Sequence, residues 1–282
     1  MNFQKVTIYI AAYNAERTIV QCINSILNQT IKFNEIIIID DYSSDNTVNL
    51  VNNFKDIRLI KNQSNKGLSY CRNLAFKKSQ NDIIASIDSD VVLENNWLEV
   101  MLPLIKKNNL ILYGGNMVEK YTNNIFNNWR AKYYSQNWGH SDLHNPPFIF
   151  GCNSIQTKDI WRKVGGYDEN LMTNGEDVDY SKKVKMIDKF SLFYSSKAMS
   201  YHLQEDNLKS LSTRVWRYHS YGYKLKNITL LRFFKLSIKQ IKFFFQRTFK
   251  DLSTFKFNYI FVNIFVLIKF IQLEFRNYLN NK

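Results

Sequence analysis

The segment Ile83-Ile84-Ala85-Ser86-Ile87-Asp88-Ser89-Asp90 joins an apolar, strand-forming run to two carboxylates. A short apolar run rich in β-branched residues is typical of a strand that is buried on both faces of a parallel sheet. The two carboxylates then lie where the strand leaves the sheet, and carboxylate oxygens are ligands for hard divalent ions such as Mg²⁺. The same residues are also typical of a turn that caps a following helix, and their spacing alone does not decide between the two.

Strand-like and helix-like segments alternate around this stretch. We expect strands at 6–11, 35–39, 57–61 and 82–87, and helices at 15–27, 45–54, 67–78 and 94–106. The second half is less regular, with expected strands at 110–118, 148–155 and 191–195 and expected helices at 158–164 and 177–187. The alternation predicts an α/β fold with a doubly wound, mostly parallel sheet. Such sheets bind ligands beyond the carboxyl ends of their strands.

Polar side chains follow three of the expected strands. Tyr13-Asn14-Ala15-Glu16 follows the first strand, Asp40 to Asp45 follow the second, and Asp88-Ser89-Asp90 follows the fourth. Each group alone is typical of turns and caps. On adjacent parallel strands, however, the three groups predict one shared polar crevice.

The order of these motifs resembles that of the family 2 glycosyltransferases, which have the GT-A fold. The matching segments cover roughly residues 4 to 205 and are Ala12-Tyr13-Asn14, Asp40 to Thr47, Asn65 to Ser69, Arg72-Asn73, Asp88-Ser89-Asp90, Gly165 to Glu169 and Gly175-Glu176-Asp177. The resemblance implies a metal-dependent, inverting enzyme that transfers a sugar from a nucleotide-diphosphate sugar, most often a UDP-sugar, to a hydroxyl of a saccharide or lipid-linked acceptor. A role in bacterial surface glycan biosynthesis would fit.

The resemblance also implies a donor and metal site. Asp41 would accept from the nucleobase, and Arg72 would lie near the diphosphate or order the metal loop. Asp88 and Asp90 form the family's DXD-type motif, which would bind the donor through Mg²⁺ or Mn²⁺. The donor-binding residues so implied are Tyr13, Asn14, Glu16, Asp41, Arg72, Asp88 and Ser89. His202 corresponds to a third metal ligand in some members, although a lone histidine is more often structural.

The catalytic half of the site is expected after residue 118. Asp177 of the family's Glu-Asp pair would be the catalytic base, because an acceptor hydroxyl is a poor nucleophile until its proton is removed. Carboxylates at a helix start are also favourable with the helix dipole, and that structural explanation stays open for Glu176. Glu176 and Asn153 are expected on the acceptor side. The expected domains are a catalytic domain at 1–223, with a nucleotide-sugar half at 1–118 and an acceptor half at 119–223, and a tail at 224–282.

The positive charge is concentrated in the tail. The net charge is +14, and residues 224–282 hold 12 basic and 2 acidic residues, 12 − 2 = +10. A helical stripe in the tail consists of Phe234, Ile238, Ile241, Phe245, Phe249 and Leu252. A basic amphipathic helix suits an anionic membrane surface, while packing on the catalytic domain or in an oligomer is the alternative. The apolar segment 259–268 is shorter than the roughly 20 residues of a spanning helix, so we expect peripheral attachment.

The remaining sequence features limit the location and the alternatives. The N-terminus has no signal peptide, and Cys22, Cys71 and Cys152 lie far apart, so we expect a cytoplasmic protein on the inner membrane face. Residues 214–217 (Arg-Val-Trp-Arg) lack the Gln of the QxxRW motif of processive polymerases. A sugar-nucleotide pyrophosphorylase would need a Gly-rich loop after the first strand. A non-catalytic membrane- or nucleic-acid-binding protein would not need the carboxylates, whose charge would repel nucleic acid.

Overall fold

The computed structural model describes residues 5–105, 110–220 and 229–280, and the chain divides into two compact units. Unit 1 comprises Met1–Lys120 and Gln136–Leu203, and unit 2 comprises Tyr121–Ser135 and Gln204–Lys282. The boundary expected from the sequence lies at residue 223 instead. The difference arises because Trp129 packs into one core with Leu211 and Val215, so that both segments join the C-terminal helices. The first residues of the expected tail, 224–228, lie outside the described residues.

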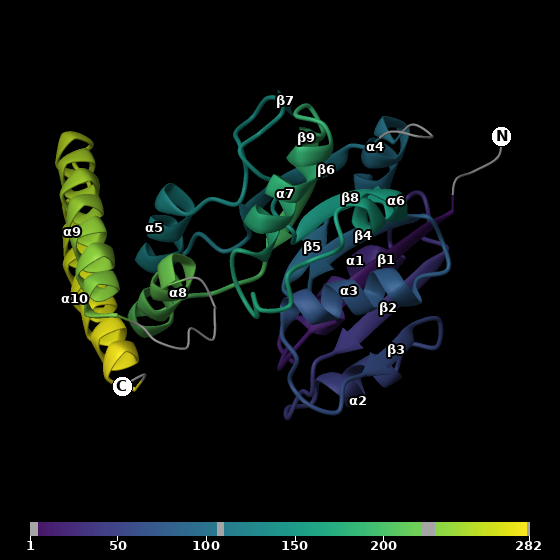
Figure 1. Cartoon of the computed structure of the whole chain (residues 1–282), viewed down its shortest axis with the longest axis horizontal. Coiled ribbons are helices and arrows are strands. Elements are labelled where there is room, and N and C mark those ends of the chain that lie inside the picture. Colours follow the sequence, from purple (N-terminus) through teal and green to yellow (C-terminus); the bar gives the residue numbers. More distant parts are fainter. Residues whose placement is uncertain (1–4, 106–109, 221–228, 281–282) are drawn as a thin grey trace. The chain divides into compact units, whose positions relative to one another are not determined.

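Unit 1 contains a nine-stranded mixed sheet in the order β3-β2-β1-β4-β8-β6-β9-β5, with β7 paired to β9 (Figure 1). The strands β1 to β4 are parallel, as predicted, whereas β8 runs antiparallel to its neighbours β4 and β6. The bounds of the strands are β1 Val6–Ala12, β2 Glu35–Asp40, β3 Arg58–Lys61, β4 Ile83–Asp88, β5 Val91–Leu93, β6 Leu112–Glu119, β7 Leu143–His144, β8 Asn153–Thr157 and β9 Leu192–His202.

Helices cover both faces of this sheet. On one face, β1 and β4 pack with the helices α1 (Ile19–Leu27), α2 (Thr47–Asn52) and α4 (Trp97–Met101). On the other face lie the helices α3 (Leu68–Lys78), α6 (Lys158–Lys163) and α7 (Glu176–Ile187). The strands β1, β2 and β4 are buried on both faces of the sheet. Their sequences are therefore continuously apolar and do not alternate between apolar and polar residues.

Three expected helices are shorter than predicted, and the one expected at 45–54 is α2, which covers only Thr47–Asn52. The first begins at Ile19, because the backbone at Ala15 and Thr18 forms a turn. The segment expected to be helical at 94–106 contains α4 and a short 3₁₀ helix at Leu102–Leu104, where a proline removes a backbone donor. The last residue of that expected helix lies outside the described residues.

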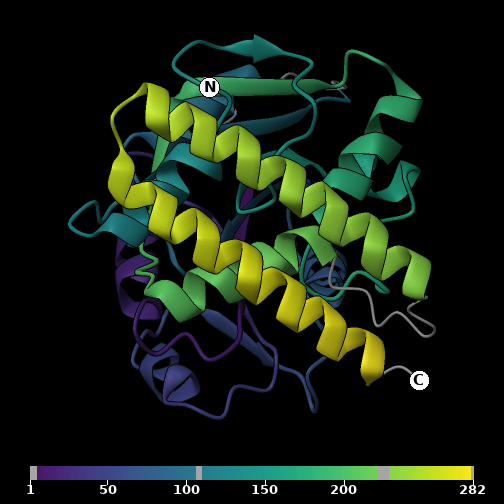
Figure 2. The same ribbon diagram turned by 90° about the vertical axis from the view of Figure 1, so that its left-hand side faces the viewer.

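Unit 2 is helical and is formed by α5 (Ile125–Tyr133), α8 (Leu208–Ser220), α9 (Leu230–Ser253) and α10 (Phe257–Leu279). The helices α9 and α10 run side by side as a hairpin, and α10 also packs on α8 and α5 (Figure 2). Among the described residues, α10 is the one helix that is long and apolar enough to cross a bilayer, a test that core helices also pass. The apolar segment at 259–268 therefore belongs to a helix of 23 residues.

Candidate active site

The polar ends of the parallel strands lie together at one edge of the sheet. Ala12 of β1 is opposite Asp40 of β2, and Ala11 is opposite Asp88 of β4. The residues that follow β1, β2 and β4 are therefore neighbours in space. This is the shared crevice that the sequence predicts.

The loops after β1 and β2 are joined by two of the predicted donor residues. The Ser44 backbone N–H donates to Asn14 Oδ1 at 2.8 Å, and the Asn46 backbone N–H donates to Glu16 Oε2 at 3.0 Å. These bonds hold the loops together, so Asn14 and Glu16 shape the pocket whether or not they touch a donor. Tyr13 is 53% exposed beside them, and Tyr42 on the next loop is 59% exposed. Tyr42 is not among the residues predicted from the sequence, although an aromatic residue next to Asp41 is a visible signal.

Asp41 fixes the loop that follows β3. Its carboxylate accepts hydrogen bonds at 2.8 Å from the backbone N–H groups of Lys66 and Gly67 and from Asn62 Nδ2. Each carboxylate oxygen has two lone pairs, so capacity for a further donor remains. Its neighbour Asp40 is also buried, and Asp40 Oδ1 has no hydrogen-bond partner. An unpartnered buried carboxylate oxygen is costly, and Asp40 is thus a further candidate for donor recognition that the sequence did not single out.

Arg72 connects the donor half of the site to the catalytic half. The side chain is 1% exposed, and its Nη1 donates to Ser86 Oγ and to the Gly151 carbonyl. Its Nη2 lies 3.1 Å from Asp88 Oδ1 and 3.5 Å from Glu176 Oε1. Such a buried guanidinium with a forked donor geometry orients acidic side chains rather than a solvent-borne ligand. Arg72 thus contacts the carboxylates of Asp88 and Glu176 from within the core.

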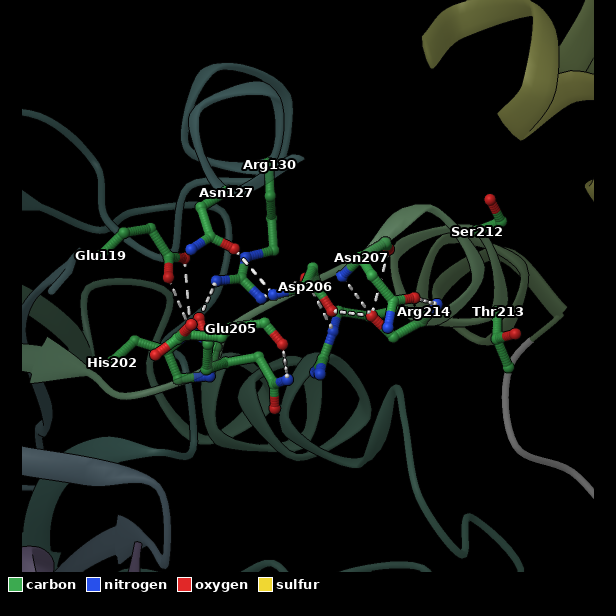
Figure 3. Close-up of polar contacts among 12 residues, drawn as sticks. Glu119, Asn127, Arg130, His202, Glu205, Asp206, Asn207, Ser212, Thr213 and Arg214 are labelled. Atoms are coloured by element: carbon green, nitrogen blue, oxygen red, sulfur yellow. Dashed lines mark hydrogen bonds and ion pairs between the residues drawn. The ribbon is translucent and has the colours of Figure 1, made fainter. Parts of the chain in front are cut away.

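The motif carboxylates lie beside His202. Asp90 Oδ2 is 3.3 Å from His202 Nε2, and Glu119 Oε2 is 3.0 Å from His202 Nδ1. Figure 3 shows the Glu119 carboxylate facing the His202 ring. Burial acts to lower the pKa of His202, but the Asp90 and Glu119 carboxylates outweigh it and raise the pKa to about 9. For Asp88, burial has the opposite effect and raises the pKa, while the positive charge of Arg72 offsets part of that rise. Glu119 is a site residue that sequence analysis missed.

Asp88, Asp90 and His202 carry side chains of the kinds that ligate divalent ions. Among the described residues, no group of three or more His, Cys, Asp and Glu is arranged so that it could hold a metal ion, so an ion here would need further ligands, such as the phosphates of a donor. The 3.3 Å between Asp90 Oδ2 and His202 Nε2 is close to the roughly 3 Å that separates adjacent ligands of an octahedral ion. The Asp88 and Asp90 side chains are 33% and 29% exposed and can meet a ligand from solvent. Mg²⁺ and Mn²⁺ bind substrate phosphates together with one or two carboxylates, and Asp88 and Asp90 are two such carboxylates.

The acidic pair at the start of α7 completes the cluster. Gly175 precedes α7 in the left-handed conformation, with φ of 84°, and turns the chain so that Glu176 and Asp177 open the helix. Asp177 accepts from its neighbour Val178 at 2.8 Å and from Gly151 at 3.4 Å. Burial raises the pKa of Asp177. Burial and the adjacent Asp177 raise the pKa of Glu176 to about 8. Asp177 is less buried than Glu176.

Asn153 is placed differently from the prediction. The residue is 1% exposed and lies in β8, where its Oδ1 accepts from Trp97 Nε1 at 2.8 Å and its Nδ2 donates to Ser200 Oγ at 2.7 Å. Both ends of the amide are thus used within the core. Asn153 therefore ties β8 to α4 and β9, and its amide is engaged inside the core. Ser89 lies between the two motif carboxylates and is partly exposed.

The arrangement has clear relatives. A sequence model of the family described as "Glycosyl transferase family 2" matches residues 7–165. The chain is 41% identical over 113 residues to the UDP-Glc:alpha-D-GlcNAc-diphosphoundecaprenol beta-1,3-glucosyltransferase WfgD of Escherichia coli, covering 39% of this chain and 45% of the relative. An uncharacterized glycosyltransferase of Haemophilus influenzae is 36% identical over 120 residues, which is 41% of this chain and 48% of that protein. The chain thus spans about half the length of these curated relatives.

A solved structure has the same fold. The crystal structure of GalNAc-T7 with UDP, GalNAc and Mn²⁺ matches with a TM-score of 0.58 at 15% identity, over 76% of this chain and 48% of that one. This likeness confirms the GT-A fold, with its mostly parallel donor-side strands. The matched family is one of transferases, so neither alternative raised from the sequence is favoured. The sequence model covers more than half of the chain, and this protein therefore belongs to glycosyl transferase family 2.

Proposed function

We propose that this chain transfers a sugar, with inversion, from a nucleotide-diphosphate sugar to a hydroxyl of a saccharide or lipid-linked acceptor. The observation that carries the proposal is that Arg72 contacts both Asp88 and Glu176, while Asp90, two residues after Asp88, lies beside His202. A donor site and a catalytic base are the two parts that such a transfer needs.

The donor half would bind the nucleotide at the loops after β1 and β2. Tyr13, Tyr42 and Asp41 would contact the nucleoside, with UDP as the favoured nucleotide. Asp88, Asp90 and His202 would hold Mg²⁺ or Mn²⁺, which would neutralise the diphosphate charge as the sugar–phosphate bond breaks. Arg72 keeps Asp88 in place, and Glu119 keeps the His202 ring oriented, since it accepts at the nitrogen that faces away from Asp90.

The catalytic half would activate the acceptor. Asp177 would accept the proton of the acceptor hydroxyl as that oxygen bonds to the anomeric carbon, and the nucleoside diphosphate would leave from the opposite face. Burial raises the pKa of Asp177, which makes the carboxylate a stronger base than an exposed aspartate. Burial and the adjacent Asp177 raise the pKa of the neighbouring Glu176, which reduces the charge repulsion within the pair. Direct displacement at the anomeric carbon inverts its configuration.

The acceptor class is proposed from the relatives. The WfgD enzyme is named for transfer to a diphosphoundecaprenol-linked GlcNAc, so a lipid-diphosphate-linked saccharide is the first acceptor to test. An acceptor of this kind sits in a membrane, and the enzyme would then work at the cytoplasmic face of that membrane, in bacterial surface glycan synthesis.

The test is donor turnover with a panel of nucleotide sugars, Mn²⁺ and a lipid-diphosphate-linked GlcNAc. Asp177→Asn should still bind nucleotide while the turnover number falls by about 10²- to 10⁴-fold, the usual contribution of a general base. Asp179→Asn is the matched control, because Asp179 lies in the same first turn of α7 but pairs with Lys183 at 3.0 Å. Equal activity of the two variants would refute Asp177 as the base. A product with retained configuration would refute direct displacement.

A further inference from the structure

The helix α9 buries polar side chains and exposes apolar ones. Its buried residues are Ser237, Gln240 and Asp251. Large apolar side chains on its outside are 38–78% exposed and recur at intervals of three or four residues: Leu231, Phe234, Ile238, Ile241, Phe245, Phe249 and Leu252. A surface helix of a globular protein has the opposite arrangement, with its apolar stripe against the core. Along this stripe, α9 presents apolar side chains to its surroundings, where a helix of a water-soluble protein would present polar ones.

The neighbouring helix α10 carries a second exposed stripe. Its apolar residues that are 44–61% exposed are spaced by three, four or seven: Phe257, Phe261, Ile264, Ile268, Phe275 and Leu279. The opposite side of α10 is buried, with Val262, Val266 and Phe270 almost fully covered. The two helices run side by side (Figure 2), and each carries an exposed row of apolar side chains. Monomeric soluble proteins rarely expose apolar patches of this extent, and such patches mark protein or membrane interaction sites.

The charges around these rows are all of one sign. The two carboxylates of the hairpin, Asp251 and Glu274, are each 0% exposed. Asp251 pairs with Lys132, and Glu274 accepts from Trp216 at 2.8 Å. The exposed charged side chains of the described part of the hairpin are all basic: Lys235, Lys239, Lys242, Lys250, Lys256 and Arg276. An apolar surface bordered only by positive charge is complementary to a bilayer that contains anionic lipid.

The contacts of α10 argue against a spanning arrangement. Asn263 accepts from Trp129 Nε1 and donates to Asp251 Oδ2 at 2.7 Å, so a polar side chain in the middle of α10 is bonded inside unit 2. Glu274 is bonded in the same way near the end of the helix. A helix that crosses a bilayer would have to break these bonds or carry the groups into hydrocarbon. These contacts instead favour a hairpin that lies along the membrane–water interface.

We propose that the α9–α10 hairpin is a docking surface for an anionic lipid bilayer. Its two apolar rows would enter the boundary between headgroups and acyl chains, while the lysines contact anionic headgroups. The proposal does not depend on the transferase reaction, and its test uses no donor or acceptor.

The experiment is co-sedimentation of the full chain with vesicles of phosphatidylglycerol and phosphatidylcholine. The variant Ile238→Ser/Phe245→Ser/Phe249→Ser should need roughly a hundredfold more lipid for half-binding, since three apolar anchors are removed. The matched control is Met186→Ser/Phe190→Ser in unit 1, whose side chains are 87% and 65% exposed, and its binding should be unchanged. Binding should also weaken with pure phosphatidylcholine and with high salt.

Three results would overturn the proposal. The first is equal vesicle binding by the hairpin variant and the parent chain. The second is a stable dimer that ignores vesicles and becomes monomeric in the hairpin variant, which would make the surface an interface between two copies. The third is a membrane-bound chain from cells that alkaline carbonate does not release, which would make α10 a spanning helix. Because all substituted residues are exposed, an unchanged far-UV circular dichroism spectrum should accompany each variant.

Discussion

Replacement of Arg72 by methionine tests the residue that joins the two halves of the site. Methionine keeps much of the length of the side chain but removes its charge and donors. The lost bonds from Nη1 to Ser86 and to the Gly151 carbonyl are worth about 1 kcal/mol each. The contact with Asp88 adds about 1 kcal/mol, discounted because that carboxylate is 33% exposed.

The contact with Glu176 adds little at neutral pH. Burial and Asp177 raise the pKa of Glu176, which weakens its negative charge, and the distance from Arg72 is 3.5 Å. The sum predicts that Arg72→Met lowers the stability of the sheet by about 3 kcal/mol. The control Arg58→Met removes a surface pair with Glu35, in which Arg58 is 43% exposed, and should cost less than about 1 kcal/mol.

Hydrogen exchange of the β1 and β4 amides is the appropriate assay. It reports the opening free energy of this sheet, whereas a single unfolding curve of a chain with two units need not be two-state. Equal losses of protection in Arg72→Met and Arg58→Met would refute the reasoning. So would an unchanged affinity for Mn²⁺ with nucleotide, because Asp88 would then not need Arg72 to hold it.

Three further predictions concern packing, pH and thiols. In Gly115→Ala, the new Cβ would lie 2.5 Å from the Ala198 carbonyl and from Asn153 Oδ1, so we expect a loss of about 1–3 kcal/mol in thermal unfolding; a loss below about 0.5 kcal/mol would contradict this packing. Burial, Arg247 and Lys239 lower the pKa of His219 to about 4. Unit 2 should therefore lose about 2–3 kcal/mol of its free energy of unfolding as pH falls from 6.5 to 4. His219→Gln should flatten this pH dependence when unfolding is measured at a series of pH values. Burial raises the pKa of all three cysteine thiols, so a thiol reagent should label the native chain far more slowly than the unfolded chain at Cys22, Cys71 and Cys152, and rapid native labelling would contradict their burial.

The sequence predicted the donor half of the fold well because its strands are continuous apolar runs. β1, β2 and β4 lie within a residue of the predicted segments, and their polar ends meet as expected. The sequence predicted the start of the first helix less well, because hydrogen bonds between loops determine the backbone conformation there. The chain at Ala15–Thr18 forms a turn rather than helix, because Asn14 and Glu16 tie it to the next loop.

The second half depends on long-range contacts that no local pattern encodes. β9 continues to His202, well beyond the predicted 191–195, because it pairs with β6 along its length and β6 brings Glu119 beside that histidine. Asn153 looked like a site residue from its motif, but its partners Trp97 and Ser200 lie 56 and 47 residues away in sequence. The apolar stripe of α9 was visible in the sequence, whereas its exposure and the polar side that it buries were not.

The measurement that tests the central claim most directly is thermal stability with nucleoside diphosphates, in the presence of Mn²⁺ or of a chelator. A ligand that binds only the native state stabilises it by about 2.7 kcal/mol at a hundredfold excess over its dissociation constant. The account predicts a rise in Tm with one nucleotide and Mn²⁺, lost with chelator and in Asp90→Asn, but kept in Asp82→Asn, an exposed carboxylate just before β4. A rise that survives in Asp90→Asn, or no rise with any nucleotide, would contradict the donor and metal site described above.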